Sequence, residues 1–264
     1  MALATSISRA AACPVICLAL LAVIGHASAD AQAAETELDA YAKKSFREAN
    51  VRYQQQPVEA AAAWQFGRAC FDLAEFATNR PQRASLAERG IAACRLAVAR
   101  ESNSAPAHYY LAMNFGQLAR TKTLGALRLV DQMEREFLRA RDLDEQIDYA
   151  GPDRNLGQLY SDAPVFGSVG SRARAREHLK RAAELAPRYP ENQLNLVEAL
   201  LSWGDRTNAC RQFQTIEDIW PAARTNFVGA AWAASWADWE PRLKKLKKQI
   251  EDPARPLDTP REKH

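Results

Sequence analysis

Histidine, the side chain best suited to acid–base and metal chemistry near neutral pH, is scarce in this 264-residue chain. Beyond residue 29 the histidines are His108, His178 and His264, the last of which ends the chain. None belongs to an H-E-x-x-H motif, and G-x-S-x-G, G-x-x-x-x-G-K and G-x-G-x-x-G are all absent from the sequence. No spacing places a base beside a nucleophile with a third group to orient it. The sequence therefore predicts no catalytic residue, no cofactor, no metal site and no enzymatic activity.

Three cysteines also lie beyond residue 29, namely Cys70, Cys94 and Cys210. They form no C-x-x-C pair, which excludes a zinc ribbon and a thioredoxin-type motif. Cys70 and Cys94 fall where two helices of one hairpin are expected to face each other. In an oxidising compartment they could form a disulfide, and otherwise they would pack as small apolar side chains. The sequence leaves both outcomes open.

The elements that carry these residues are indicated by a pattern that recurs every 40 to 45 residues. A pair of adjacent residues is followed, three positions after its second member, by another apolar or aromatic residue. The four copies are Phe66-Gly67 with Cys70, Leu111-Ala112 with Phe115, Leu156-Gly157 with Tyr160, and Leu196-Val197 with Leu200. A second pattern, at spacings of four and three, follows each copy: Gly90, Cys94, Ala97; Met133, Phe137, Ala140; Ala175, Leu179, Ala182; and Ala209, Phe213, Ile216. Such a period is typical of stacked helical hairpins, each too small to bury its own apolar face.

The composition supports this interpretation, because alanine, leucine, glutamate and arginine dominate and glycine is scarce. We expect an all-α, right-handed superhelix of four hairpins with a C-terminal capping helix. That last helix carries Trp232, Trp236 and Trp239 at spacings of four and three, so the three indoles share one face. This face either packs on the stack or forms an exposed docking surface.

The two ends of the chain have different compositions. An arginine, an apolar run and then Ala27-Ser28-Ala29 make residues 1–29 a predicted secretory signal peptide. We therefore expect a periplasmic or secreted protein whose mature chain has no transmembrane helix. The mature chain is divided into an N-terminal helical extension (30–57), the repeat domain (58–251) and a disordered, proline-containing tail (252–264). Cleavage of residues 1–29 would remove Arg9 and lower the formal net charge from +3 to +2. A charge this close to neutral gives no electrostatic signature of nucleic-acid binding.

The apolar spacing resembles that of the tetratricopeptide repeat. In that family a Leu-Gly pair and an aromatic residue mark the first helix of a unit, and alanines mark the second, as Leu156-Gly157-Tyr160 and Ala175-Leu179-Ala182 do here. The family's unit has 12 residues between the small residue of the first helix and the one opening the second. Here the gaps are 23, 21, 18 and 12, so only the fourth unit keeps the standard spacing.

The combination of longer hairpins and a signal peptide resembles the T-component family of TRAP transporters. Members of that family associate with a substrate-binding subunit. The residues that carry this resemblance are Gly151, Pro152, Arg154, Leu156, Gly157, Ala163, Pro164, Gly167, Gly170 and Ser171. The resemblance covers roughly residues 60–215.

The repeat family also implies which side chains face the concave groove. Carried over position by position, the ligand or partner groove comprises Trp64, Arg68, Tyr109, Tyr110, Met113, Arg154, Asn155, Gln158, Asn195 and Glu198. These positions lie off the apolar stripe of each first helix. Arginine can bind a carboxylate with two hydrogen bonds, asparagine can bind a peptide backbone, and tyrosine offers apolar area with a polar tip.

We expect a helical-repeat scaffold that binds a protein partner, which the resemblance identifies as a transporter's solute-binding subunit. The alternative is a protein that binds a small organic acid or a peptide directly in the groove. A direct ligand site predicts that Tyr109, Arg154 and Asn155 converge. A scaffold predicts an open face with an exposed apolar patch.

Overall fold

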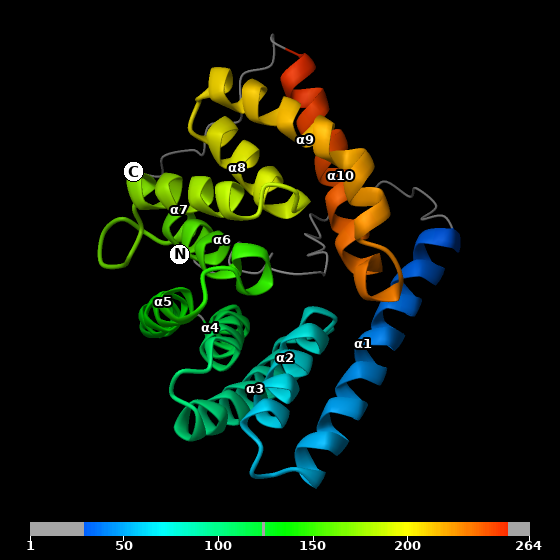
Figure 1. Cartoon of the computed structure of the whole chain (residues 1–264), viewed down its shortest axis with the longest axis vertical. Coiled ribbons are helices and arrows are strands. Elements are labelled where there is room, and N and C mark those ends of the chain that lie inside the picture. The colour runs from blue at the N-terminus through cyan, green and yellow to red at the C-terminus, as the bar shows by residue number, and fades with distance from the viewer. Residues whose placement is uncertain (1–28, 123–124, 253–264) are drawn as a thin grey trace.

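The computed structural model describes residues 29–122 and 125–252, and within them the chain forms ten helices (Figure 1). Their bounds are α1 Ala29–Gln55, α2 Ala60–Glu75, α3 Arg80–Arg100, α4 Ala105–Ala119, α5 Ala126–Leu143, α6 Ile147–Asp162, α7 Arg172–Leu185, α8 Pro190–Ser202, α9 Arg206–Asn226 and α10 Ala230–Glu251. Residues 1–28 of the predicted signal peptide and residues 253–264 of the predicted tail lie outside the described residues. Among the helices that are described, none combines the length and the apolarity needed to cross a bilayer.

Local sequence explains where several helices begin. The side chains of Asn79, Ser171 and Asp205 precede α3, α7 and α9, and each accepts a hydrogen bond from a backbone N–H of the first turn. Pro81 occupies the first turn of α3, where the missing N–H has no cost. Gly204, in the turn before α9, has a φ of 74°, in the left-handed region that glycine tolerates.

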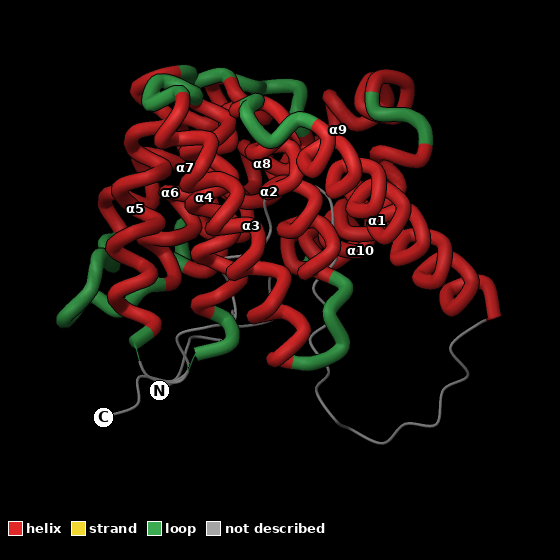
Figure 2. Tube along the Cα trace, turned by 90° about the horizontal axis from the view of Figure 1, so that it is seen from below, coloured by secondary structure: helices red, strands yellow, loops and turns green. Residues whose placement is uncertain are grey.

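The helices pack as four consecutive hairpins, α2/α3, α4/α5, α6/α7 and α8/α9, so the predicted all-α architecture is confirmed. The first helices also contact one another in the order α2, α4, α6, α8, and form one layer of the stack. Figure 2 shows the helices running side by side, with loops gathered at their two ends.

Helix α10 packs on α8 and α9 and caps the stack. Trp239 is buried, while Trp232 and Trp236 are half-buried. The rings of Trp232 and Trp239 lie 6.2 and 5.4 Å from that of Tyr189, and 4.6 and 5.8 Å from that of Phe227, between ring centroids. The tryptophan face of α10 is thus mainly a packing face and not an open docking surface.

The N-terminal helix turns the stack into a closed ring. Helix α1 lies along α2 and also contacts α10, the helix at the opposite end of the repeat domain (Figure 1). It is held by Phe46 and Tyr53, whose rings lie 5.5 and 5.1 Å from that of Phe66 on α2. The concave side that the sequence suggested would be an open groove is therefore covered by α1.

Small residues allow the helices to approach closely. Gly67 faces the Sγ atom of Cys94, and a Cβ atom at this position would overlap the sulfur. Cys94 thus packs against Gly67, and both it and Cys70 are free, buried thiols, so the disulfide that the sequence allowed is not formed. Burial raises the pKa of Cys70 to about 12 and that of Cys94 well above its usual value, which makes both thiols poor nucleophiles.

Gly90 makes a similar contact with the buried side chain of Asn114, which also donates hydrogen bonds to the carbonyls of Gly67 (2.9 Å) and Tyr110 (2.8 Å).

We predict that Gly90→Ala lowers the free energy of unfolding by about 2 kcal/mol, because the new methyl group overlaps the Asn114 amide. In an Asn114→Ala background the same change should be neutral or stabilising by up to about 1 kcal/mol, since alanine is the better helix former. Urea denaturation of the four proteins in this cycle checks the coupling. Equal effects of Gly90→Ala in both backgrounds would refute the packing argument.

Candidate functional site

A cavity of about 440 Å³ lies inside the ring, within the size range of small-molecule sites. Helices α1, α2 and α10 enclose it, together with the residue that precedes α8 and the beginning of α6. Its wall combines charges of both signs with aromatic rings. The charged residues are Glu48, Arg52, Arg68, Asp72 and Asp148, and the aromatic ones are Tyr41, Phe76, Tyr189 and Trp232.

Asp148 reaches this cavity from an unusual backbone turn. Asp148, Tyr149 and Ala150 have φ values of 51°, 56° and 61°, so three consecutive residues other than glycine are left-handed. Each costs roughly 1–2 kcal/mol relative to the right-handed conformation. Such strain persists only where surrounding contacts fix it, and it is often found at functional sites.

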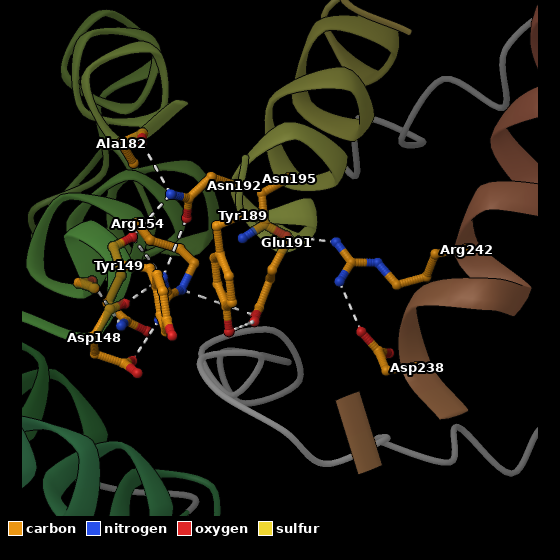
Figure 3. A network of polar contacts seen from close by, with 12 residues as sticks. Asp148, Tyr149, Arg154, Ala182, Tyr189, Glu191, Asn192, Asn195, Asp238 and Arg242 are labelled. Carbon is orange, nitrogen blue, oxygen red and sulfur yellow. Dashed lines mark hydrogen bonds and ion pairs between the residues drawn. The ribbon is translucent and has the colours of Figure 1, made fainter. Parts of the chain in front are cut away.

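The side chain of Arg154, fully buried on α6, fixes the turn (Figure 3). One guanidinium nitrogen donates to the backbone carbonyls of Asp148 (2.9 Å) and Tyr149 (3.2 Å), and the other to the Asp148 carboxylate (2.6 Å). Asn192 of α8 donates to the same Tyr149 carbonyl at 2.9 Å. The turn therefore depends on a buried cation and on a second helix.

Both close hydrogen bonds to the Asp148 carboxylate end on the same oxygen. The Tyr109 hydroxyl donates to Oδ2 at 2.6 Å, as Arg154 does. The side chain of Asp148 is 15 % exposed, so part of the carboxylate still faces the cavity. Its position is fixed by α4 and α6 together.

Buried charges continue from this turn towards α10. Glu191 lies between Arg154, whose Nε is 3.9 Å from its carboxylate, and Arg242 on α10 (Figure 3). Arg242 binds Asp238 at 2.7 Å and Glu198 at 2.8 Å, and also donates to Asn195. Burial raises the pKa of Glu191 to about 7, although Arg154 and Arg242 both oppose this shift.

On the opposite wall, Arg68 and Asp72 form an ion pair one turn apart on α2, with a nitrogen–oxygen distance of 3.6 Å. Their side chains are 55 % and 33 % exposed, so both have surface open to the cavity. Burial raises the pKa of Asp72 to about 6, and Asp148 pushes in the same direction while Arg68 opposes it. The carboxylates of Asp72 and Asp148 thus interact across one space.

The structure brings together three of the residues that the sequence proposed for the groove. Asn155 donates to the Tyr109 hydroxyl at 3.0 Å, and Arg154 lies 3.4 Å from the same oxygen. All three side chains are buried and bind one another and the turn instead of lining the cavity. Their predicted direct contact with a ligand remains a prediction, and the structure gives them a supporting position behind Asp148.

The other predicted groove residues are distributed over the interior. Arg68 lines the cavity, whereas Trp64 stacks on Tyr110 at 5.9 Å, and Met113 lies in the same apolar core. Gln158 is half-buried on α6, and its side-chain oxygen has no hydrogen-bond partner. Asn195 and Glu198 bind Arg242 of the capping helix.

Sequence reasoning missed Asp72, Asp148, Tyr189 and Trp232 as cavity residues. Asp72 had a usable signal, because it lies four positions after Arg68 on the same helix face. Asp148 had none, since no sequence pattern indicates three left-handed residues without glycine. In the described part of the chain no group of three or more histidine, cysteine, aspartate or glutamate side chains is arranged to hold a metal ion.

Comparison with known proteins agrees with the fold and gives a partial family match. The family model described as "Regulator of microtubule dynamics protein 1-3" matches residues 27–129, from α1 into α5. The structure is similar to the crystal structure of a thermophilic tetratricopeptide-repeat protein from Thermus thermophilus, with a TM-score of 0.54 and 16 % sequence identity. That similarity covers 84 % of this chain and 97 % of the other. No curated protein matches the chain. The fold is thus tetratricopeptide-like.

We predict that Arg154→Met lowers the free energy of unfolding by about 3–5 kcal/mol, because it leaves Asp148 uncompensated and the strained turn without its donor. The matched control is Arg128→Met, which changes an exposed arginine on α5 and should cost less than about 0.5 kcal/mol. Urea denaturation followed by circular dichroism measures both. Similar losses in the two variants would show that the turn does not depend on Arg154.

The raised pKa of Glu191 predicts a pH dependence of stability. The pKa of the Glu191 carboxyl is 4.5 in the unfolded chain and about 7 in the folded chain. The stabilisation that comes from keeping this carboxyl protonated is therefore complete below pH 4.5 and is lost as pH rises to 7. Glu191→Gln removes this titration. Between pH 4.5 and pH 8 we expect the wild type to lose about 3 kcal/mol more than the variant, in urea denaturation at each pH. Parallel pH profiles of stability for the wild type and Glu191→Gln would mean that Arg154 and Arg242 fully offset the effect of burial on the pKa of Glu191.

Proposed function

We propose that this protein is a helical-repeat scaffold that binds a protein partner through the loop at 163–171, between α6 and α7. The observation that carries the proposal is an apolar pair at the tip of this loop. Phe166 is 94 % exposed and Val165 69 % exposed, in a protein whose other aromatic side chains are mostly packed. An exposed aromatic side chain on a rigid scaffold is a common anchor of protein interfaces.

The base of the loop is fixed, although its tip is exposed. The N–H of Gly170 donates to the carbonyl of Pro164 at 3.1 Å, and that of Ser171 donates to the carbonyl of Tyr160 at 2.9 Å. A Cβ atom on Gly170 would overlap the carbonyl of Ala163, so the two arms of the loop touch. The loop projects from the stack beside α7 (Figure 1). A pre-formed loop of this kind loses little conformational freedom when it binds.

The partner we propose is the substrate-binding subunit of a transporter, in the periplasm. The support is the sequence resemblance to the T-components of TRAP transporters, which includes Ala163, Pro164, Gly167, Gly170 and Ser171. These are the residues that close the loop and turn its tip, and Gly167 has a φ of 75°. The loop also contributes to the 18-residue gap that exceeds the 12 of the standard repeat.

The test uses purified protein and the candidate subunit in a binding titration. Phe166→Ser should raise the Kd by at least about 30-fold, as expected when an interface anchor worth about 2 kcal/mol is removed. Leu127→Ser is the matched control, because Leu127 is a 38 % exposed apolar residue on α5, and its Kd should change less than about twofold.

Equal affinities of the Phe166→Ser and Leu127→Ser proteins would exclude the loop as the docking element. Absence of binding by the wild type would exclude the transporter subunit as partner.

A second function, direct binding of a small organic acid or a peptide, is favoured by a separate observation. The cavity of about 440 Å³ is lined by Arg68, whose side chain is 55 % exposed, and by Arg52. Arginine can bind a carboxylate with two parallel hydrogen bonds. The two functions are compatible, because the loop is outside the ring and the cavity is inside it.

A further inference from the structure

We infer that the central cavity binds a free α-amino acid with an aromatic side chain, and that it recognises the ammonium and the carboxylate of this ligand with separate groups. The inference rests on the second proposed function, direct ligand binding, and names its ligand class. It is carried by the presence of carboxylates, arginines and aromatic rings around one cavity.

The ammonium group would lie between Asp72 and Asp148. These carboxylates come from different elements, α2 and the turn at the start of α6, and neither is fully paired by the protein. Asp72 has Arg68 at 3.6 Å, longer than a strong charge-assisted hydrogen bond. Asp148 uses Oδ2 for both of its close donors, which leaves its other oxygen for a third. A cation between them would relieve the repulsion that helps to raise the pKa of Asp72.

Packing alone does not explain the position of Asp148, because the fold maintains it at a cost. Three left-handed residues and a fully buried arginine hold this carboxylate at the cavity wall. If α6 simply began at residue 151, it would need neither the left-handed residues nor the buried arginine, since Pro152 suits a first turn. The turn and Arg154 therefore act as positioning elements for Asp148.

The carboxylate of the ligand would meet Arg68, with Arg52 on α1 nearby in the same wall. The side chain of Arg68 is 55 % exposed, and its guanidinium has donors beyond the Nε that faces Asp72. Arg52 donates one hydrogen bond, to Gln65 at 2.9 Å, and has further donors available. The two arginines are on α1 and α2, so the N-terminal helix completes the site.

The side chain of the ligand would contact the aromatic wall residues that have accessible surface, Tyr41, Phe76 and Trp232. Tyr189 is buried and supports Trp232, with 6.2 Å between the ring centroids. Tyr189 and Trp232 belong to a cluster with Tyr149, which stacks on Tyr189 at 4.5 Å and is 42 % exposed. Offset and edge-to-face contacts with such rings favour another aromatic group. The cavity volume is sufficient for phenylalanine with a few waters.

Isothermal titration calorimetry on the purified full chain at pH 8 tests the inference with three probes. L-Phenylalanine carries both charges, 3-phenylpropanoate lacks the ammonium group, and 2-phenylethylamine lacks the carboxylate. We expect phenylalanine to bind at least about tenfold more tightly than either analogue, because each lost charge leaves a charged partner without its ligand.

Each other outcome overturns a defined part of the proposal. Equal binding of 3-phenylpropanoate would refute recognition of the ammonium and leave the organic-acid function in place. Equal binding of 2-phenylethylamine would refute recognition of the carboxylate. Absence of binding by all three probes at millimolar concentration would refute both this inference and the aromatic ligand class. A parallel titration with an organic acid such as succinate tests the broader ligand-binding function by itself.

Variants assign the two ends of the ligand. Asp72→Asn should weaken phenylalanine binding at least about tenfold and leave 3-phenylpropanoate unchanged, whereas Arg68→Gln should weaken phenylalanine to a similar extent and leave 2-phenylethylamine unchanged. Asp131→Asn, which removes an exposed carboxylate on α5, is the matched control and should change no affinity. Asp72→Asn avoids the strained turn, so thermal unfolding of this variant close to wild type keeps the test valid. Equal losses for all probes in both variants would refute the assignment.

Discussion

The buried guanidinium of Arg154 is the interaction on which the interior of this protein depends. It belongs to α6, yet it binds the turn at the start of α6, the hydroxyl of Tyr109 on α4 and the side chain of Asn192 on α8. A buried cation is costly unless paired, and here it is paired with Asp148 at 2.6 Å. One side chain therefore links three successive first helices and holds a strained backbone in place.

The alternation of charges that begins with Asp148 and Arg154 continues through Glu191 to Arg242 on the capping helix. This arrangement couples the middle of the stack to its C-terminal end. Helix α1 then joins α10 to the first hairpin and closes the ring. A tetratricopeptide-like stack alone would present an open concave face, and the two terminal helices add the walls that make a partly open cavity there.

The protein thus offers two regions with different chemistry. The loop at 163–171 is outside the ring, has a rigid base and presents apolar side chains, as partner-binding loops do. The cavity is inside, and its wall carries both signs of charge. Asp148 belongs to the cavity, while Tyr160, whose carbonyl fixes the loop, lies on the same helix as Arg154. Helix α6 therefore supports both regions.

The sequence by itself determined the hairpins, because the 40- to 45-residue period and the capping residues are local and each unit must bury its apolar stripe on its neighbours. It also predicted that Tyr109, Arg154 and Asn155 would converge if the protein binds a ligand directly. Only the tertiary structure decided that these three support a site without lining it, since their partners come from other helices. Only the tertiary structure likewise decided that α1 covers the groove, because α1 does so through contacts with α2 and α10. It also decided the position of Asp148, because the left-handed backbone there is imposed by Arg154 and Asn192 and by no local preference.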